Sequence, residues 1–214
     1  MSAPPLCVVV GYGPGVGAAV AQRFAAGGFE VVGLARDPSR HAALAGPGIS
    51  LRGADAADPQ ALAAALPAET AVLVYNAYRA SFTMPGPSAL VPAELQADFA
   101  VNVAGALIAA QAVLPGMRAA GRGSILFTGG GLALDPIEWL PAASLAIGKA
   151  GLRSLAMTLH AELAPAGIHA GTVTIAGTVA PGTPFAPERV ASAFWDLHAD
   201  PPGAFRSELI FRGS

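Results

Sequence analysis

The sequence predicts an α/β fold in which a doubly wound parallel sheet of about seven strands carries helices on both faces, giving three layers. Two observations lead to this class. Short, nearly continuous apolar runs alternate with longer segments whose apolar residues recur at helical spacing, and this alternation extends over most of the 214 residues. The apolar runs also lack the polar alternation of a half-exposed strand, as parallel strands buried on both faces do. Right-handed crossovers between such strands place helices on both sides of the sheet.

Seven segments are predicted strands, because most of them are short and apolar and most are bounded by Gly, Pro or Asp. They cover residues 6–10, 29–35, 49–53, 71–75, 124–128, 167–177 and 207–212.

Six helices are predicted between these strands. The first ends on two glycines, Gly27 and Gly28, which commonly terminate helices. Two others begin with an aspartate followed by proline, a capping side chain before a residue suited to the first helical position. The predicted helices cover residues 17–28, 37–44, 58–66, 92–121, 142–164 and 187–200, and the loops 78–91, 129–141 and 178–186 complete the pattern. No repeat or linker divides the chain, so we expect one domain over residues 1–214.

Composition excludes several classes of protein. The 12 basic and 14 acidic residues give a net charge of −2, which argues against a basic face for nucleic acid. Apolar runs are interrupted by Gly, Pro or a charge before about 18–20 residues, so we expect no membrane span. The single cysteine, Cys7, excludes an internal disulfide and a cysteine-based metal site. Without a basic segment before the first apolar run, we expect no signal peptide and a cytoplasmic location.

The first predicted strand runs directly into a glycine-rich loop that opens a helix. Such a junction turns backbone N–H groups and the positive end of the helix toward a pyrophosphate. The spacing is G-x-x-x-G-x-G, with valine where a G-x-G-x-x-G motif has its third glycine, and a purely structural tight turn is the alternative interpretation. The residues expected to bind the dinucleotide here are Gly11, Gly13, Pro14, Gly15, Val16 and Gly17.

The end of the second predicted strand indicates which dinucleotide. An acidic residue there would bind the adenosine ribose and repel a 2′-phosphate. This chain has Ala35 and then Arg36, with no carboxylate before Asp37. Because an arginine can pair with a phosphate through two N–H groups, NADP(H) is favoured over NAD(H). A solvated surface arginine is the alternative.

These residues resemble the short-chain dehydrogenase/reductase family, whose fold is Rossmann-like, and the likeness covers essentially the whole chain. The glycine spacing matches the opening motif of that family, and Asp55 in "GADAAD" matches an acid near the adenine. "YNAY" (75–78) stands where the family has Asn-Asn-Ala-Gly, and Asn102 matches a helix asparagine that supports a water chain to the active-site lysine. The resemblance implies that the cofactor also contacts Asp55, Ala56, Asn76, Ala77, Lys149, Gly177 and Thr178.

The chemistry of that family rests on Tyr-x-x-x-Lys and a serine at the end of the fifth strand. Residues i and i+4 share a helix face, so the lysine can lower the pKa of the tyrosine. Here the lysine is Lys149, but Leu145 stands four residues before it. The serine position falls on Gly129 or Gly130, and the nearest hydroxyl is that of Thr128. The resemblance therefore extends to a divergent subset that lacks the tyrosine.

Other groups are candidates for the missing proton donor. Tyr78 follows the fourth predicted strand beside a cationic neighbour, Arg79, and is the first candidate. Ser144 is turned off the Lys149 face by helical rotation, the loop acids Asp135 and Glu138 are ordinarily solvated, and water relayed through Lys149 and Asn102 is a further option. The predicted catalytic set is Asn102, Lys149 and Tyr78, and we assign no histidine and no metal.

Three functions are compatible with this pattern. The first is an NADP(H)-dependent oxidoreductase that acts on a small carbonyl or alcohol substrate with a degenerate Ser-Tyr-Lys site. The alternative is a catalytically inactive nucleotide-binding sensor or assembly subunit, and a scaffold that binds nothing is weaker because Lys149 is retained. The family resemblance implies a homodimer or homotetramer through helices 92–121 and 142–164.

Overall fold

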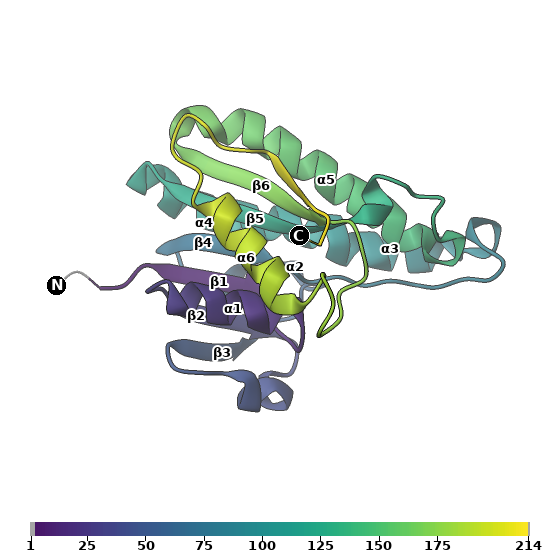
Figure 1. Cartoon of the computed structure of the whole chain (residues 1–214), viewed down its shortest axis with the longest axis horizontal. Helices are drawn as coiled ribbons and strands as arrows, with labels where there is room; N and C mark the ends of the chain where they lie inside the picture. The colour runs from purple at the N-terminus through teal and green to yellow at the C-terminus, as the bar shows by residue number, and fades with distance from the viewer. Residues whose placement is uncertain (1–2, 214) are drawn as a thin grey trace.

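A computed structural model, which describes residues 3–213, contains a seven-stranded parallel sheet with the order β3-β2-β1-β4-β5-β6-β7 (Figure 1). The strands are β1 (Leu6–Val10), β2 (Glu30–Ala35), β3 (Ile49–Gly53), β4 (Thr70–Tyr75), β5 (Gly123–Gly130), β6 (Ile168–Ile175) and β7 (Glu208–Phe211). The order reverses between β1 and β4, which are hydrogen-bonded neighbours. The predicted doubly wound α/β fold is confirmed.

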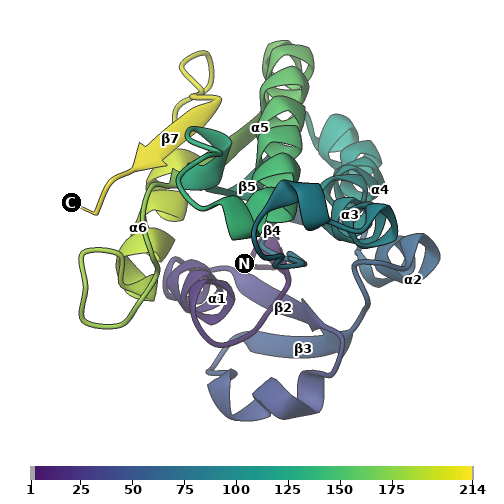
Figure 2. The ribbon, with the colours of Figure 1, turned by 90° about the vertical axis from the view of Figure 1, so that its right-hand side faces the viewer.

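Helices cover both faces of the sheet (Figure 2). The helices α1 (Val16–Ala26) and α6 (Pro187–His198) pack on one face, and one apolar cluster joins them to the sheet. The helices α2 (Pro59–Ala65), α4 (Gly105–Ala120) and α5 (Ala143–Leu163) pack on the other through a second cluster. The short predicted helix after β2 is a 3₁₀ segment, η1 (Pro38–Leu44), and the Asp37 side chain before it accepts a hydrogen bond from the Ser39 N–H.

The predicted helix 92–121 is divided in the structure. It consists of α3 (Pro92–Phe99), a π-helical segment η3 (Ala100–Ala104) and α4, all continuous along the chain. Within η3 the N–H of Gly105 donates to the carbonyl of Ala100, five residues earlier. The Tyr75 hydroxyl donates to the Val101 carbonyl over 2.6 Å, and a Cβ at Gly105 would overlap this hydroxyl. The widened turn therefore lies where the Tyr75 phenol meets the helix.

The same helical stretch bears on the expectation that the chain has no membrane span. Pro92–Ala120 is long and apolar enough to cross a membrane by length and composition alone, but 44% of its apolar window is buried within the protein. Ala106, Ala110 and Val113 of α4 are fully buried in the cluster against β4 and β5. These residues of α4 thus belong to the core.

Candidate functional site

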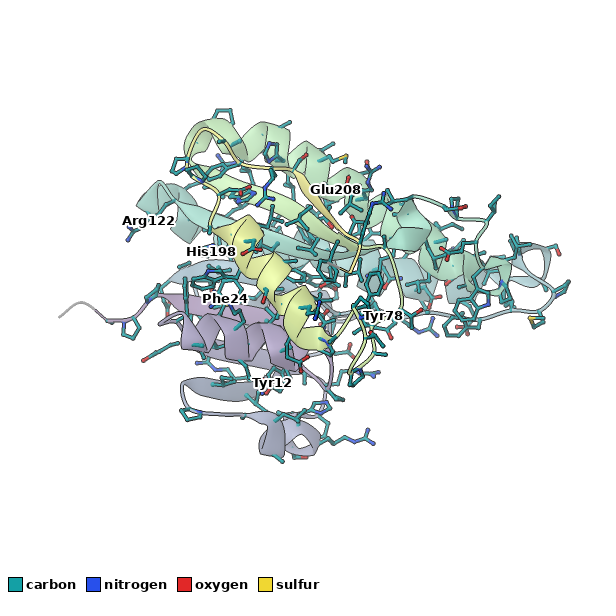
Figure 3. The ribbon with its side chains drawn as sticks, in the orientation of Figure 1. Tyr12, Phe24, Tyr78, Arg122, His198 and Glu208 are labelled. Carbon is teal, nitrogen blue, oxygen red and sulfur yellow. The ribbon has the colours of Figure 1, made fainter. Side chains whose placement is uncertain are left out.

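A cleft of about 740 Å³ lies at the carboxyl ends of the strands, beside the point where the strand order reverses. Open α/β sheets bind ligands at this position, because the loops on the two sides of the reversal diverge. The lining comes from the ends of β1, β2 and β4 and the segments after them, and Tyr12 and Tyr78 of this lining are labelled in Figure 3.

The glycine loop is shaped by its close approach to the end of β4. Gly11 has φ +84°, and a Cβ there would overlap the backbone of Ala77. A Cβ at Gly17 would stand 2.6 Å from the Gly11 carbonyl oxygen. Gly15, with φ +98°, turns the chain into α1 with open space around it. Glycine is thus required at the first and last positions by packing and at the middle one by backbone conformation.

Asn76 ties three strands together at the floor of the cleft. Its Nδ2 donates to the Gly11 carbonyl over 2.9 Å, and its Oδ1 accepts from the Thr128 hydroxyl over 3.0 Å. The side chain is therefore a brace between the glycine loop and β5. Asp55 also lines the cleft, and its Oδ1 accepts the N–H of Ala57 over 2.9 Å. Asn76 and Asp55 therefore hold the shape of the cleft through these hydrogen bonds, which use only some of their side-chain donors and acceptors.

Two arginines lie at the end of the cleft beside β2. Arg36 and Arg40 both line it and are exposed, and within residues 3–213 neither forms an ion pair. The nearby carboxylate of Asp37 accepts from the N–H and hydroxyl of Ser39, which lowers its pKa together with the charge of Arg40. The acid at this position thus serves as a helix cap, and the guanidinium groups are available to an anion.

Three lining residues were not predicted from the sequence: Arg40, His41 and Tyr12. His41 lies over the glycine loop, 3.7 Å from where a Cβ on Gly13 would be. The sequence does indicate Arg40 and His41, because the Asp-Pro pair that starts η1 places them on the first turns after β2. Tyr12 packs its ring against Gly33, is 3% exposed and has no hydrogen-bond partner for its hydroxyl in the described part of the chain. A ligand in the cleft is one source of that partner.

Lys149 is buried below the carboxyl end of β5. Its Nζ donates to the Thr128 carbonyl over 2.6 Å and lies 5.7 Å from the centre of the Tyr78 ring. Burial lowers the pKa of the ammonium from 10.5 to about 8, because no acid neutralises it. The side chain is 8% exposed. A buried cation without a carboxylate partner is a candidate functional group.

The structure separates the two glycines considered for the serine position. A Cβ at Gly129 would stand 2.6 and 2.7 Å from the hydroxyls of Thr172 and Thr174, so no side chain fits there. A Cβ at Gly130 would make an ordinary 3.5 Å contact with the Lys149 stem. Gly130 is therefore the position from which a side chain would face the lysine.

The interpretation of Arg79 as the cation beside Tyr78 is corrected by the structure. Its guanidinium pairs with Glu94 over 2.6 Å and with the buried carboxylate of Asp98. Lys149 is the cation that lies by the Tyr78 ring. Arg79 instead fixes the backbone, because its N–H and carbonyl both bond to the Asn102 side chain over 2.8 Å. The Asn102 amide thus holds the residue next to Tyr78.

The remaining polar candidates are either engaged in other contacts or exposed to solvent. The Ser144 hydroxyl donates to Asp98, on the side of α5 that meets α3. Asp135 and Glu138 are exposed and are not among the lining residues of the cleft. Of the residues predicted to bind the cofactor, the cleft is lined by Gly11, Gly13, Pro14, Arg36, Asp55, Ala56, Asn76 and Ala77, and not by Gly15, Val16, Gly17, Lys149, Gly177 or Thr178.

Comparisons with known proteins agree with this geometry. The family model described as short chain dehydrogenase matches residues 6–189. A metagenomic short-chain oxidoreductase crystallised with NADP is 28% identical, with 97% of this chain and 96% of that one covered and a TM-score of 0.85. An oxidoreductase of the short chain dehydrogenase/reductase family from Burkholderia thailandensis is 29% identical, with 99% and 92% covered and a TM-score of 0.86. A search of curated proteins finds no match. The chain belongs to the short-chain dehydrogenase/reductase family.

Proposed function

We propose that this chain is an NADP(H)-dependent oxidoreductase for a small carbonyl or alcohol substrate, with Lys149 and Tyr78 at its reactive centre. The observation that carries the proposal is the buried ammonium of Lys149, held at the Thr128 carbonyl beside the Tyr78 ring. Family membership supports the oxidoreductase class. The proposal treats residues 1–214 as one working domain.

The residues of the cleft fit a dinucleotide. Gly11 and Gly13 leave the backbone bare for a pyrophosphate, and α1 directs its positive end toward the same loop. Asp55 and Ala56 would meet the adenosine. The orphaned Tyr12 hydroxyl supports a ligand that brings a polar group into the cleft. When bound, the nicotinamide supplies or accepts the hydride.

Arg36 and Arg40 support a preference for the phosphorylated cofactor. Both guanidinium groups line the cleft, and the one carboxylate between them is occupied by Ser39. A 2′-phosphate would gain charge-assisted hydrogen bonds from them, whereas a ribose hydroxyl would gain less. The similar metagenomic protein was crystallised with NADP, which agrees with this choice.

The residues of this chain would handle the proton as follows. Leu145 has no proton to give, so the Tyr78 hydroxyl donates to the substrate carbonyl oxygen while hydride reaches the carbon. The Lys149 ammonium lies beside this phenol, 5.7 Å from the centre of its ring. Asn102 acts through the Arg79 backbone and keeps this tyrosine in place. Hydride transfer without any acid would be slower but still possible.

A second candidate function is a nucleotide-binding sensor or assembly subunit without turnover. Leu145 and Gly130 support it, because a leucine stands four residues before Lys149 and a glycine lies against the lysine stem. In such a protein Lys149 would bind the ribose of the nucleotide, and no proton would be transferred.

Oxidation of NADPH with a panel of carbonyl compounds tests the two functions. We expect turnover by the wild type and a loss of about 10²–10⁴-fold in Tyr78→Phe, the usual contribution of a general acid. Tyr75→Phe is the matched control, since that phenol is fully buried and cannot reach substrate. An inert wild type that gains activity on Leu145→Tyr with Gly130→Ser would instead establish the sensor.

We also propose a homodimer or homotetramer through α3, α4 and α5. Phe99 and Ile147 support this, because these large apolar side chains are 43% and 45% exposed on those helices. Light scattering behind size exclusion measures the state, and aspartate at both positions should shift it to monomer. A cytoplasmic setting is proposed as well.

A further inference from the structure

The position of the Tyr78 ring depends on the backbone that carries it. The side chain is 63% exposed, so packing restrains it only in part. The next residue, Arg79, is held through both its N–H and its carbonyl by the Asn102 amide. Asp98 stands four residues before Asn102 on the continuous stretch of α3 and η3, and residues at this spacing share a helix face. Two neighbouring side chains of one helix face therefore reach the segment that follows β4.

Asp98 is a fully buried carboxylate with donors at both of its oxygens. Oδ2 accepts the backbone N–H of Ser81 over 2.7 Å, and Oδ1 accepts from the Arg79 guanidinium. Burial alone would raise the pKa of this acid, but the hydrogen bonds lower it, so the group is ionised at neutral pH. One side chain thus holds the segment 79–81 at two points.

A further bond connects the same carboxylate to α5. The Ser144 hydroxyl, 1% exposed, donates to the Asp98 oxygen that also accepts the Ser81 N–H. Ser144 lies in the first turn of α5, the helix that carries Lys149. Asp98 therefore bonds both to the segment next to Tyr78 and to the helix of the buried ammonium.

Glu94 provides a comparison on the same helix, one turn earlier. Its carboxylate accepts from the Arg79 guanidinium over 2.6 Å and from the Ser81 hydroxyl over 3.1 Å. These partners are side-chain groups, and the Glu94 side chain is 49% exposed. Water can replace such an acceptor at the surface, so Glu94 restrains the segment far less than Asp98 does.

We propose that Asp98 is a positioning residue that keeps the Tyr78 hydroxyl beside the Lys149 ammonium by bonding at once to the segment 79–81 and to Ser144. This inference rests on the proposed function, in which Tyr78 donates the proton. An amide cannot replace the carboxylate, because it has one acceptor oxygen and both Asp98 oxygens face N–H donors. Asp98→Asn therefore turns an NH₂ group toward Ser81 or Arg79 and releases the segment.

The separation of the two reactive groups can be measured without turnover. Lys149 is the only lysine in the sequence and Tyr78 is one of three tyrosines, so side-chain labels on these two residue types report on few protons. In the wild type we expect a nuclear Overhauser effect between the Lys149 side chain and the Tyr78 ring, whose centre lies 5.7 Å from Nζ. The effect should disappear in Asp98→Asn and weaken in Ser144→Ala. Glu94→Gln, the same acid-to-amide change on the same helix, should retain it.

Steady-state oxidation of NADPH with a carbonyl substrate supplies the kinetic readout. A misplacement of about 1 Å at a reacting group can cost about 10²-fold, so kcat of Asp98→Asn should fall by about that factor. KM for NADPH should stay near the wild-type value, because Asp98 is not among the residues that line the cleft. Ser144→Ala should lose less of kcat, and Glu94→Gln should match the wild type.

An Overhauser effect of wild-type strength in folded Asp98→Asn would overturn the proposal, and so would its absence from the wild type. If Asp98→Asn does not fold, an effect and a kcat unchanged in Ser144→Ala overturn it equally. A wild type without turnover, whose Overhauser effect responds to the three variants as expected, would support the positioning by Asp98 and refute only the proposed function.

Discussion

Replacing Lys149 with methionine tests the buried ammonium on which the reactive centre depends. The pKa of Lys149 falls from 10.5 in the unfolded chain to about 8 in the folded one. Each pKa unit corresponds to about 1.4 kcal/mol, so the charged form costs the native state about 3 kcal/mol. Because the folded pKa is the lower one, this cost is complete below about pH 8 and fades as pH rises toward the unfolded value.

The measurable quantity is the difference in free energy of unfolding between Lys149→Met and the wild type. Its absolute value also contains the hydrogen bond to the Thr128 carbonyl, which the methionine leaves unmade. The pH dependence of this difference reflects only the titration of Lys149, because every other group titrates in both proteins and its contribution cancels. Between about pH 6 and pH 9.5 the wild type should gain about 2 kcal/mol on the variant.

Urea unfolding across that pH range gives the two free energies. A difference that is flat with pH would show that the ammonium is not desolvated in the folded protein. A difference that moves in the variant's favour as pH rises would show that an acid stabilises the charge, and either outcome refutes the account of Lys149.

Three further predictions concern the frame around the site. Gly129→Ala should cost about 1–3 kcal/mol of stability because its Cβ would overlap two threonine hydroxyls, whereas Gly130→Ala should be nearly neutral. Thermal unfolding compares the two variants, and equal losses of stability would contradict the assignment of the two glycines. Asp98→Asn should cost about 2–4 kcal/mol of stability at neutral pH, because hydrogen bonds from Ser144, Ser81 and Arg79 lower the pKa of Asp98 although burial alone would raise it. The difference in free energy of unfolding between variant and wild type should narrow as pH falls through the native pKa of Asp98. A difference that does not change with pH would refute this. Tyr75→Phe should cost about 1 kcal/mol through the lost bond to Val101, measured by urea unfolding, and an unchanged stability would argue against that bond.

Much of the fold follows from local pattern. The predicted strands 6–10 and 49–53 have the bounds of β1 and β3. The first is a continuous apolar run before a glycine, and such a run has few other conformations available. The division of helix 92–121 could not be predicted, since it depends on Tyr75, a residue distant in sequence whose phenol contacts the Val101 turn. Composition alone also cannot distinguish this long apolar helix from a membrane span, because its burial depends on the tertiary fold.

The site was predictable where backbone geometry sets the residue type. Gly11 and Gly17 follow from a strand–loop–helix junction whose parts nearly touch. The partners of Arg79 were not predictable, because Glu94 and Asp98 are brought to it by the fold of α3 beneath the loop. Position along the chain placed Tyr78 near the site, and only the fold put the Lys149 ammonium beside its ring.

The most direct test of the central claim is calorimetric titration of the folded protein with NADPH and with NADH. The cleft with Arg36 and Arg40 predicts that NADPH binds at least about tenfold more tightly, since charge-assisted hydrogen bonds contribute about 1.5–3 kcal/mol. Arg36→Ala should weaken NADPH selectively and bring the two affinities together. Absence of heat with either nucleotide, or NADPH affinity untouched by Arg36→Ala, would contradict the assignment of this cleft.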